Sequence, residues 1–478
     1  MRADERAKAG LWNLLGLWFG LHLPVSRAAY VATGFGLCVF KYVGEALAIW
    51  MATGRSYSVW AFLSPILSVR TQVLQGAAPE LGWGLVIWAI PFLWIAISMS
   101  IRRAIMAGLS PWWGFLVLVP FVNFAVMLLL AILPDVNREL VWYDEIPRHQ
   151  AEQLASRERW RIVALAVMCG LFVQVGLMLL AVYGFNSYGW MLFVASPILA
   201  GAVTSSLCQR PYYTNLTTSL SAVLLMQLAF AAGLLLFALE GVICVAMAVP
   251  LVVPLGVIGG LLGYLTATVT PTAASADDDW RSGAVCIALL PLGIWLETLT
   301  AEPPLVPVST RIEINAPPEV VWKTVLAFPA LEPAQEWYFR AGIACPMSAY
   351  IEGSGPGAVR HCVFTTGEFV EPITVWDAPR RLAFQVADQP EPMFELTPYH
   401  SIHPPHLQGT LRSEQGEFLL IPRADGGTTL QGSTWYRLHM QPLDYWGPLS
   451  EAIIHRIHLR VLRHVQHCAE QAASTTLQ

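Results

Sequence analysis

Charge is scarce in this chain of 478 residues, because only 13% are Asp, Glu, Lys or Arg. That share is about half of what soluble domains carry. A further 55% of the residues are hydrophobic, and the net charge is −5. This composition excludes a disordered chain, which would have too little apolar surface to fold, and a basic protein built to bind nucleic acid. It is typical of a protein that lies partly in a lipid bilayer.

Motifs for catalysis and metal binding are missing as well. The chain contains no GxSxG, HExxH, P-loop or dinucleotide-binding sequence. Its eight cysteines are spread so widely that no two lie closer than seventeen residues, which excludes the paired spacing of zinc and redox sites. We therefore expect buried, unreactive cysteines, no cofactor, no metal and no catalytic residue set. The protein is more naturally a binding protein than an enzyme.

Long apolar runs are what the chain has instead. A helix of about 20 apolar residues crosses the hydrocarbon core of a bilayer. The runs that approach this length are 29–50, 83–101, 111–133, 162–183, 189–207, 219–239, 242–268 and 283–300. They predict eight transmembrane helices, three in residues 1–135 and five in residues 161–301, joined by a charged connection at 136–160. The run 57–69 is too short to cross and predicts an interfacial or re-entrant segment.

The side of the membrane follows from Lys and Arg near the helix ends, which favour the cytoplasm. With eight spans and a cytoplasmic N-terminus, six basic residues lie inside and nine outside, which is the reverse of the rule. Inverting the chain, or letting residues 57–74 cross as a ninth span, corrects the count. Either choice favours a C-terminus outside the cytoplasm.

Lys41 and Glu45 lie in the first apolar run, four residues apart and therefore on one helical face. Ionisable residues at membrane depth are costly and often functional. We interpret them as an intramembrane pair that clasps neighbouring helices, with an ion or proton path as the alternative.

The composition changes abruptly after Leu299. A Pro-rich linker at 302–310 leads into a domain of soluble character at 311–472, followed by a short tail at 473–478. From residue 303 onward there are twelve basic and seventeen acidic residues, so this part carries the whole net charge. An acidic domain has no affinity for phosphate backbones, which excludes nucleic acid as its partner.

Alternation predicts strands in this soluble part. RIEINA begins with a strand, and PPEVVWKTVLAFP follows as a helix entered through prolines. Further strands are expected at 347–352, 357–366, 368–377, 380–388, 417–422 and 428–440. A final helix at about 447–472 carries an apolar stripe that covers the apolar face of the sheet. The pattern predicts an α+β domain in which a curved antiparallel sheet grips one long helix and leaves a hollow.

The stretch 308–472 resembles the START-like or SRPBCC superfamily of polyketide cyclase and lipid-transport domains. The resemblance rests on RIEINAPPEVVWKTV, GAVRHCVFTTGEFVEPITVWDAPRRLAF, GTTLQGSTWYRLHMQPLDYW and IIHRIHLRVLRHV. It implies the helix-grip fold, joined here to an α-helical membrane bundle. It also implies binding of a lipid or other hydrophobic small molecule for carriage or sensing at the bilayer. A cyclase- or dehydratase-like enzyme and a membrane scaffold or signalling protein without ligand are the alternatives.

The predicted cavity takes its lining from alternate strand positions and from one face of the last helix. The candidate ligand-binding residues are Leu382, Phe384, Val386, Leu430, Thr434, Tyr436, Ile454, Ile457, Val461, Arg360 and His361. Whether Arg360 or His361 points inward stays open, because a shift of one residue in register exchanges them.

Two groups of histidines belong to this domain. His400, His403 and His406 lie in a Pro-rich connection, where an extended backbone turns residues three apart in different directions. We therefore expect them on the cavity rim and not around a zinc ion. His455 and His458 adjoin on the final helix and reach the cavity edge, where their titration would make ligand release sensitive to pH.

Residues 17–134 are similar to the domain-of-unknown-function family numbered eight hundred and five, which are small bacterial inner-membrane proteins. The residues that match the family pattern are Arg27, Arg102, Arg103, Gly108, Trp112 and Trp113. Met106 stands where family members have an aspartate. We interpret the arginines as topogenic charge and the tryptophans as an interfacial belt. This resemblance implies a multi-pass protein of the bacterial inner membrane, with the bilayer as a partner and no indication of oligomeric state.

Overall fold

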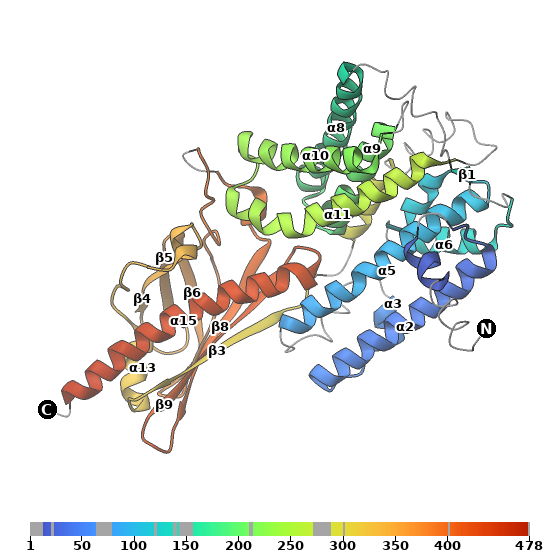
Figure 1. Ribbon diagram of the computed structural model, residues 1–478. Helices are drawn as coiled ribbons and strands as arrows, with labels where there is room; N and C mark the ends of the chain where they lie inside the picture. Colours follow the sequence, from blue (N-terminus) through green and yellow to red (C-terminus); the bar gives the residue numbers. More distant parts are fainter. Residues whose placement is uncertain are drawn as a thin grey trace. The chain divides into compact units, whose positions relative to one another are not determined.

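The structure is a computed structural model that describes residues 13–20, 23–63, 79–118, 122–136, 141–142, 156–209, 214–270, 288–299, 302–399 and 402–476. Its contacts divide the chain into two units (Figure 1). The helical unit comprises Met1–Leu67, Trp83–Phe237 and Val245–Thr300. The C-terminal unit comprises Ser68–Gly82, Ala238–Cys244 and Ala301–Gln478.

Long apolar helices dominate the N-terminal part of the chain. They are α2 (Arg27–Thr53), α5 (Pro79–Met106), α8 (Ser156–Leu179), α9 (Ser196–Gln209), α10 (Leu216–Leu236) and α11 (Val242–Thr268). Two π-helical turns, η2 (Leu180–Gly184) and η3 (Met191–Ala195), extend α8 and precede α9. Shorter elements are α3 (Val59–Leu63), the 3₁₀ helix η1 (Pro111–Leu118), α6 (Val122–Ile132) and the paired strands β1 (Val141–Trp142) and β2 (Val269–Thr270).

Six helices among the described residues are long and apolar enough to cross a bilayer. They match six of the eight predicted runs. The other two runs hold shorter apolar helices, α6 and Ala288–Thr298. The 11 residues of α6 rise about 16 Å, roughly half of a hydrocarbon core. The predicted count of eight is therefore approximate. Of the predicted interfacial run 57–69, only the part up to residue 63 lies within the described residues, and it contains α3.

Small residues let α9 and α11 approach closely. A Cβ atom at Gly259 would lie 1.9 Å from the carbonyl oxygen of Ile198, and one at Gly263 would lie 2.2 Å from that of Ala202. Two glycines four residues apart thus form a flat strip on α11 against the backbone of α9. Helices in a lipid bilayer favour this close packing, because no hydrophobic effect drives them together and van der Waals contact holds them instead.

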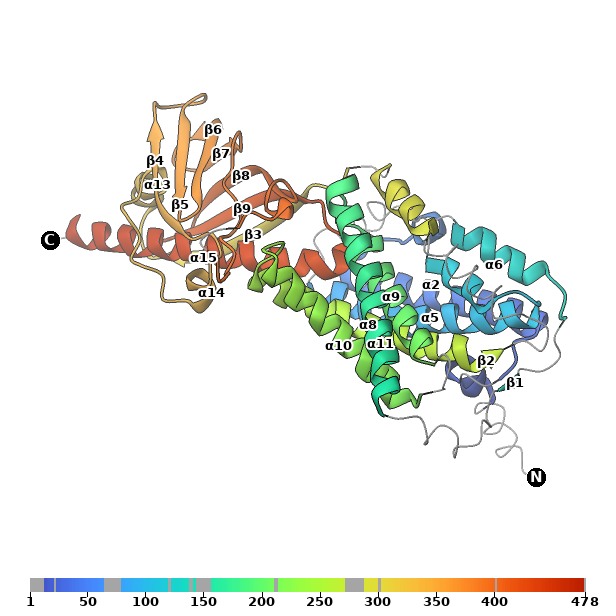
Figure 2. The same cartoon turned by 90° about the horizontal axis from the view of Figure 1, so that it is seen from above.

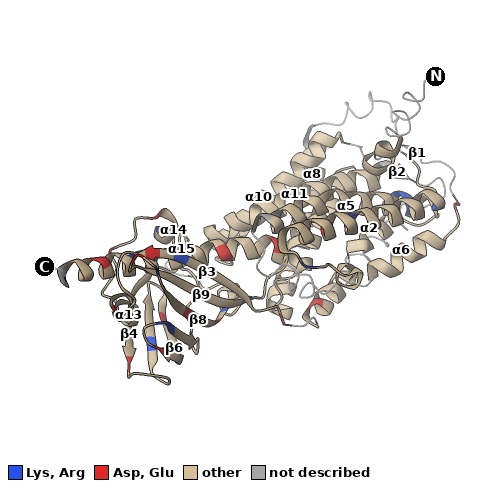
Figure 3. Ribbon diagram, turned by 90° about the horizontal axis from the view of Figure 1, so that it is seen from below, with Lys and Arg blue, Asp and Glu red and all other residues tan. Residues whose placement is uncertain are grey.

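Lys, Arg, Asp and Glu residues are sparse along the ribbon of the helical unit (Figure 3). The two adjacent arginines of α5 are fully buried. Arg102 donates to the carbonyl oxygen of Leu23 at 3.0 Å, and Arg103 forms an ion pair with Asp135. Trp112 is buried as well. Trp112 therefore lies in the core and not in an exposed interfacial belt, whereas the interpretation of Arg102 and Arg103 as topogenic charge stays a prediction. The two arginines bind backbone carbonyl oxygens near helix ends, and Trp112 fills the core of the helical unit.

The C-terminal unit contains one seven-stranded antiparallel sheet in the order β3-β9-β8-β7-β6-β5-β4. The strands are β3 (Val306–Ile314), β4 (Pro346–Glu352), β5 (Val359–Phe364), β6 (Gly367–Asp377), β7 (Arg381–Gln385), β8 (Leu411–Pro422) and β9 (Thr428–Leu438). Its helices are α13 (Pro318–Leu326), α14 (Trp337–Arg340), η4 (Pro405–Leu407) and α15 (Leu443–Thr476).

The long helix α15 lies along the concave face of the curved sheet (Figures 1 and 2). Leu462 and Val465 of the helix are buried against Leu382 and Leu430 of the sheet, which forms the core of this unit. A curled antiparallel sheet that grips one C-terminal helix is the helix-grip fold. The predicted architecture, a membrane-type helical region followed by a helix-grip domain, is confirmed.

Two strands begin earlier than predicted by the largest margins. Strand β3 begins at Val306, inside the predicted linker, and pairs there with Tyr436 of β9. Because β3 is an edge strand, Pro307 can lie within it without removing a hydrogen bond that the sheet needs. Strand β8 begins at Leu411, six residues before the predicted strand, and its register shifts between Ser413 and Gln415.

Candidate functional site

A cavity of about 140 Å³ lies in the C-terminal unit between the sheet and α15. Most of its lining is apolar, and it comes from β5 to β9, from the loop after β7 and from α15. The apolar members include Phe364, Phe369, Phe384, Val386, Phe418, Ile453, Ile454, Ile457, Val461 and Leu462. Glycine makes the space at one point, because a Cβ atom at Gly416 would lie 2.3 Å from the ring of Phe384. The ring of Phe384 therefore packs directly on the backbone of Gly416, which only a glycine allows.

Most of the sequence-predicted binding residues line this cavity. Those in the lining are Phe384, Val386, Thr434, Ile454, Ile457, Val461 and Arg360. Leu382, Leu430 and Tyr436 are buried but lie outside the lining. Alternation along a strand indicates which side chains face the core. It does not indicate which of these inward side chains line a cavity and which are packed on all sides.

His361 lies on the opposite face of β5 from the cavity. Its ring stacks on Tyr350 with 4.8 Å between centroids, and its Nδ1 atom lies 2.5 Å from Glu368. Arg360, which the sequence left as the alternative, is the inward residue and is 2% exposed.

Arg360 and Glu371 form a buried ion pair in the cavity wall, directly opposite each other on β5 and β6. The guanidinium carbon of Arg360 lies 5.1 Å from the ring centroid of Phe384 and 5.4 Å from that of Phe418. Burial raises the pKa of Glu371, and the neighbouring guanidinium opposes that shift. Nε of Arg360 has no hydrogen-bond partner among the described residues. The wall therefore offers one N–H donor to the polar end of an otherwise apolar ligand.

His458 brings a neutral imidazole to the same cavity from α15. Its Nδ1 lies 3.1 Å from Thr310 Oγ1 and its Nε2 lies 2.8 Å from Thr434 Oγ1. Burial, together with the neighbouring His455, lowers the pKa of His458 to about 4. The ring is thus uncharged near neutral pH, and its hydrogen bonds fix α15 to β3 and β9. His455 is exposed and bonds to Thr310 at 2.8 Å.

A second, more polar hollow of about 330 Å³ adjoins the cavity. The two share Val386, Gln389, Glu391 and Ser413. His403, predicted as a rim residue, is exposed and pairs with Glu391 at 2.8 Å. The shared residues give the apolar cavity a polar mouth. Sequence reasoning missed this mouth because it depends on the early start of β8, which brings Ser413 next to Gln389.

The other two predicted rim histidines do not lie with His403. His400 falls outside the described residues. His406 is buried in η4 and contacts Glu240 and Cys244.

The predicted intramembrane pair consists of Lys41 and Glu45 of α2, which form an ion pair. The Glu45 side chain is 3% exposed, and Lys41 Nζ lies 5.2 Å from the ring centroid of Phe62 and 5.9 Å from that of Phe92. An ammonium enclosed by a carboxylate and two aromatic faces is strongly held. This geometry favours the structural clasp over an ion path.

No family model matches the chain, and no curated protein matches it. The similarity of residues 17–134 to the family numbered eight hundred and five therefore stays a prediction.

Solved structures similar to this chain share its helix-grip part. An aromatase/cyclase from Streptomyces sp. R1128 is 16% identical over 35% of this chain and 95% of its own, with a TM-score of 0.23. The Aha1 protein of Colwellia psychrerythraea is 15% identical over 34% and 96%, with a TM-score of 0.22. Truncated norcoclaurine synthase from Thalictrum flavum is 14% identical over 33% and 91%, with a TM-score of 0.20. Because these identities and TM-scores are low, the fold assignment rests on the strand order and on α15 of this chain. No function follows from these neighbours.

Proposed function

We propose that the C-terminal unit binds a lipid or another hydrophobic small molecule, and that the apolar helices hold this binding unit at a bacterial inner membrane. The observation that carries the proposal is an apolar cavity under α15 whose wall contains one buried ion pair. A ligand with an apolar body and one oxygen acceptor fits this lining, because the acceptor meets Arg360 Nε and the body meets the aromatic rings.

The size of the cavity limits what it holds in this conformation. A volume of about 140 Å³ is close to that of an engineered cavity that binds benzene, about 150 Å³. One ring or a short segment of acyl chain fits, and a larger ligand requires α15 or the polar mouth to move outward. Attachment to the membrane raises the local concentration of such ligands around the cavity, because they dissolve in the bilayer. Carriage or sensing at the bilayer follows from this arrangement without covalent chemistry.

The test is to identify what the full chain retains on purification in detergent. Organic extracts of the protein are analysed by mass spectrometry, for the natural chain and for Val386→Trp, which places an indole in the cavity. We expect an apolar molecule with the natural chain and at least about a tenfold loss with the variant, corresponding to about 1.4 kcal/mol. Ile421→Trp, at a position that is 42% exposed on β8, is the matched control and should retain the molecule.

Two outcomes would overturn this proposal. Equal retention by the natural chain and Val386→Trp would mean that the molecule is bound elsewhere. A retained molecule that is the converted product of a supplied precursor would show a cyclase- or dehydratase-like enzyme instead of a carrier.

A further inference from the structure

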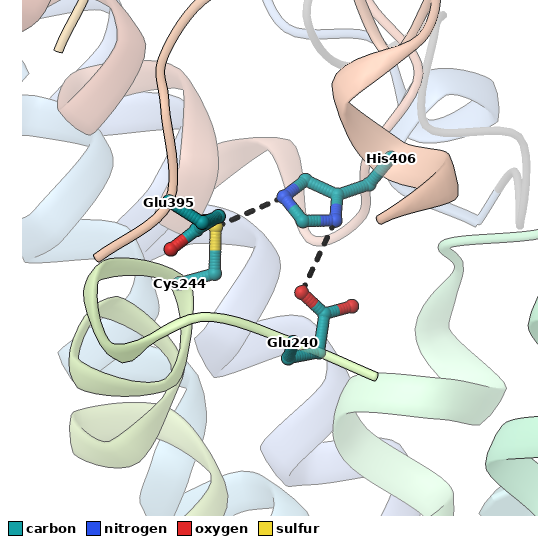
Figure 4. A group of neighbouring side chains, drawn as sticks. All are labelled: Glu240, Cys244, Glu395 and His406. Atoms are coloured by element: carbon teal, nitrogen blue, oxygen red, sulfur yellow. Dashed lines mark hydrogen bonds and ion pairs between the residues drawn. The ribbon is translucent and has the colours of Figure 1, made fainter. Parts of the chain in front are cut away.

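Four side chains from distant parts of the sequence converge at a second place in the C-terminal unit. They are Glu240, Cys244, Glu395 and His406, and one ligand atom from each lies within 4.8 Å of all the others (Figure 4). Residues Ala238–Cys244 group with the C-terminal unit by their contacts. These side chains lie outside the linings of the cavity and of its polar mouth.

The imidazole of His406 is at the centre of this cluster. Its Nε2 lies 2.9 Å from Cys244 Sγ, and its Nδ1 lies 3.3 Å from Glu240 Oε2. His406 and Glu395 are each 7% exposed. Among the described residues, no Lys or Arg pairs with Glu395, whose polar neighbour is Cys244. Two carboxylates and a thiol thus surround a single imidazole, and a buried carboxylate without a cation is costly.

The backbone holds these side chains in place. Val242 N donates to Leu396 O at 2.9 Å, which ties the start of α11 to the segment that contains Glu395. His406 is fixed in η4, where its carbonyl accepts from the Thr410 hydroxyl. A Cβ atom at Gly241 would lie 2.0 Å from Glu395 Oε2, so the carboxylate occupies space that any side chain at 241 would fill.

Cys244, His406 and Glu240 lie next to one another in that order. The same arrangement of thiol, imidazole and carboxylate occurs where a base and an orienting acid activate a nucleophilic cysteine. The position of Glu395 argues against that role here. Its carboxylate lies beside the sulfur, on the side away from Glu240, where a negative charge opposes formation of the thiolate (Figure 4). A divalent cation removes this conflict, because it neutralises the thiolate and the carboxylate together.

We propose that Cys244 Sγ, His406 Nε2 and the Glu395 carboxylate bind a zinc ion, with Glu240 orienting the imidazole through Nδ1. Sulfur, nitrogen and oxygen ligands in one set suit zinc, and a carboxylate on the second ring nitrogen is the usual partner of a ligating histidine. Zinc–sulfur and zinc–nitrogen bonds of about 2.3 and 2.0 Å place tetrahedral ligands about 3.5 Å apart. Sγ and Nε2 therefore separate by roughly 0.6 Å on binding, and the thiol proton leaves to solvent.

This ion joins three chain segments, the first turn of α11, the segment after Met393 and η4. The inference does not depend on the proposed function, because it uses none of the cavity residues. It also differs from a site made of His400, His403 and His406, since only His406 contributes.

The experiment uses the full chain in detergent, purified without a histidine tag. Zinc is measured by elemental analysis and by titration against a chromophoric chelator. We expect about one equivalent per chain, background levels for Cys244→Ala and His406→Ala, and affinity weakened roughly 10–100-fold for Glu240→Gln. His403→Ala and Cys345→Ala are matched controls that should keep the ion. With cobalt in place of zinc, the natural chain should show a thiolate-to-metal absorption band that Cys244→Ala lacks.

A chain without zinc, or Cys244→Ala that binds as much zinc as the natural chain, would overturn the proposal. In case Cys244→Ala folds poorly, alkylation of the natural chain provides a second measurement. Zinc should protect Cys244 from iodoacetamide at least about tenfold while Cys169 alkylates as before. If Cys244 alkylates equally fast with and without zinc, the metal site is excluded. If it also outpaces every other cysteine, the cluster is a nucleophilic site instead.

Discussion

Arg360 shows how a single residue sets the character of the binding cavity. Its guanidinium is buried, paired with Glu371 and flanked by two phenylalanine rings, so its charge is compensated without water. A buried pair of this kind contributes little to stability as a whole, because removing both ions from water is expensive. Removing one partner alone is a different matter, since the other charge then stays buried.

We therefore expect Arg360→Met to lower the free energy of unfolding by about 3–5 kcal/mol, because the Glu371 carboxylate loses its cation. Arg360→Met combined with Glu371→Leu should recover most of this loss. The measurement is hydrogen exchange of the β5 and β6 amides in the full chain. Arg381→Met is the control, because its pair with Glu417 leaves Arg381 49% exposed and such pairs contribute at most about 1 kcal/mol. A double variant as unstable as the single one would contradict the explanation.

The element that organises the site is α15, which supplies one wall of the cavity and part of the core. Its apolar stripe faces the sheet, while its other side carries exposed side chains such as Arg463 and His467. Its polar residue in the cavity is His458, which links it to two strands.

Acid should loosen α15 through His458. Its pKa is about 4 in the folded chain and about 6.5 in the unfolded chain, so between these values the unfolded chain binds a proton that the folded chain does not. The stabilisation is present above pH 6.5 and is lost as the pH falls toward 4, by up to about 1.4 kcal/mol per pH unit. Calorimetry of the full chain from pH 7 to 4.5 should show a steeper decline for the natural chain than for His458→Gln. His467→Gln, exposed on the same helix, should decline like the natural chain.

Packing of α15 predicts a second effect. Leu462 is 1% exposed and contacts both the core and the cavity. Leu462→Ala should lower the free energy of unfolding by about 2–5 kcal/mol, because it adds empty volume to a site that already has a cavity. Hydrogen exchange of the β9 amides measures this free energy. The control is Arg463→Ala at the neighbouring exposed position, which should change the free energy of unfolding by less than about 0.5 kcal/mol. A loss below about 1 kcal/mol for Leu462→Ala would mean that α15 closes over the gap.

Periodicity predicted the elements well, because it depends only on which residues avoid water. Alternation along β9 and the stripe on α15 predicted a curved sheet that grips one long helix, and the resemblance of residues 308–472 implied the helix-grip fold. They did not decide between Arg360 and His361, since neighbouring strand residues differ only by register. They did not reveal the partners of His406 either, because Cys244 lies 162 residues away in the chain. Contacts of this kind are created by tertiary folding and leave no spacing in the sequence.

At the scale of the whole molecule, the composition of the C-terminal unit constrains how often the chain crosses the bilayer. Ala238–Cys244, which covers the end of the connection after α10 and the first turn of α11, belongs to the same unit as residues 301–478. The two segments must therefore lie on one side of the membrane. Since α11 crosses between them, a second crossing is needed before residue 301, and the apolar run 283–300 with its helix Ala288–Thr298 is there to provide it. We therefore propose seven crossings, made by the six long helices and this run.

Seven crossings also agree with the distribution of Lys and Arg. With a cytoplasmic N-terminus and no crossing by α6, only Arg55 and Arg70 lie in outer loops of the membrane region. The basic residues near inner helix ends and in inner loops are Arg2, Arg6, Lys8, Arg27, Arg102, Arg103, Arg138, Arg148, Arg157, Arg159, Arg161, Arg210 and Arg281. Positive charge thus stays inside, as the rule requires. This count favours a C-terminal unit outside the cytoplasm, without a ninth span or an inverted chain.

Reporter fusions test this arrangement. Alkaline phosphatase, active only outside the cytoplasm, is fused after residue 55, after residue 145 or after residue 478. We expect activity at 55 and 478 and none at 145, because the arrangement that keeps Lys and Arg inside has no crossing by α6 and one by the run 283–300. Inactive enzyme at 478, together with active enzyme at 55 and inactive enzyme at 145, would place Cys244 and His406 on opposite sides of the bilayer and would contradict the zinc site as well. With the expected result, the proposed ligand of the cavity comes from the outer leaflet.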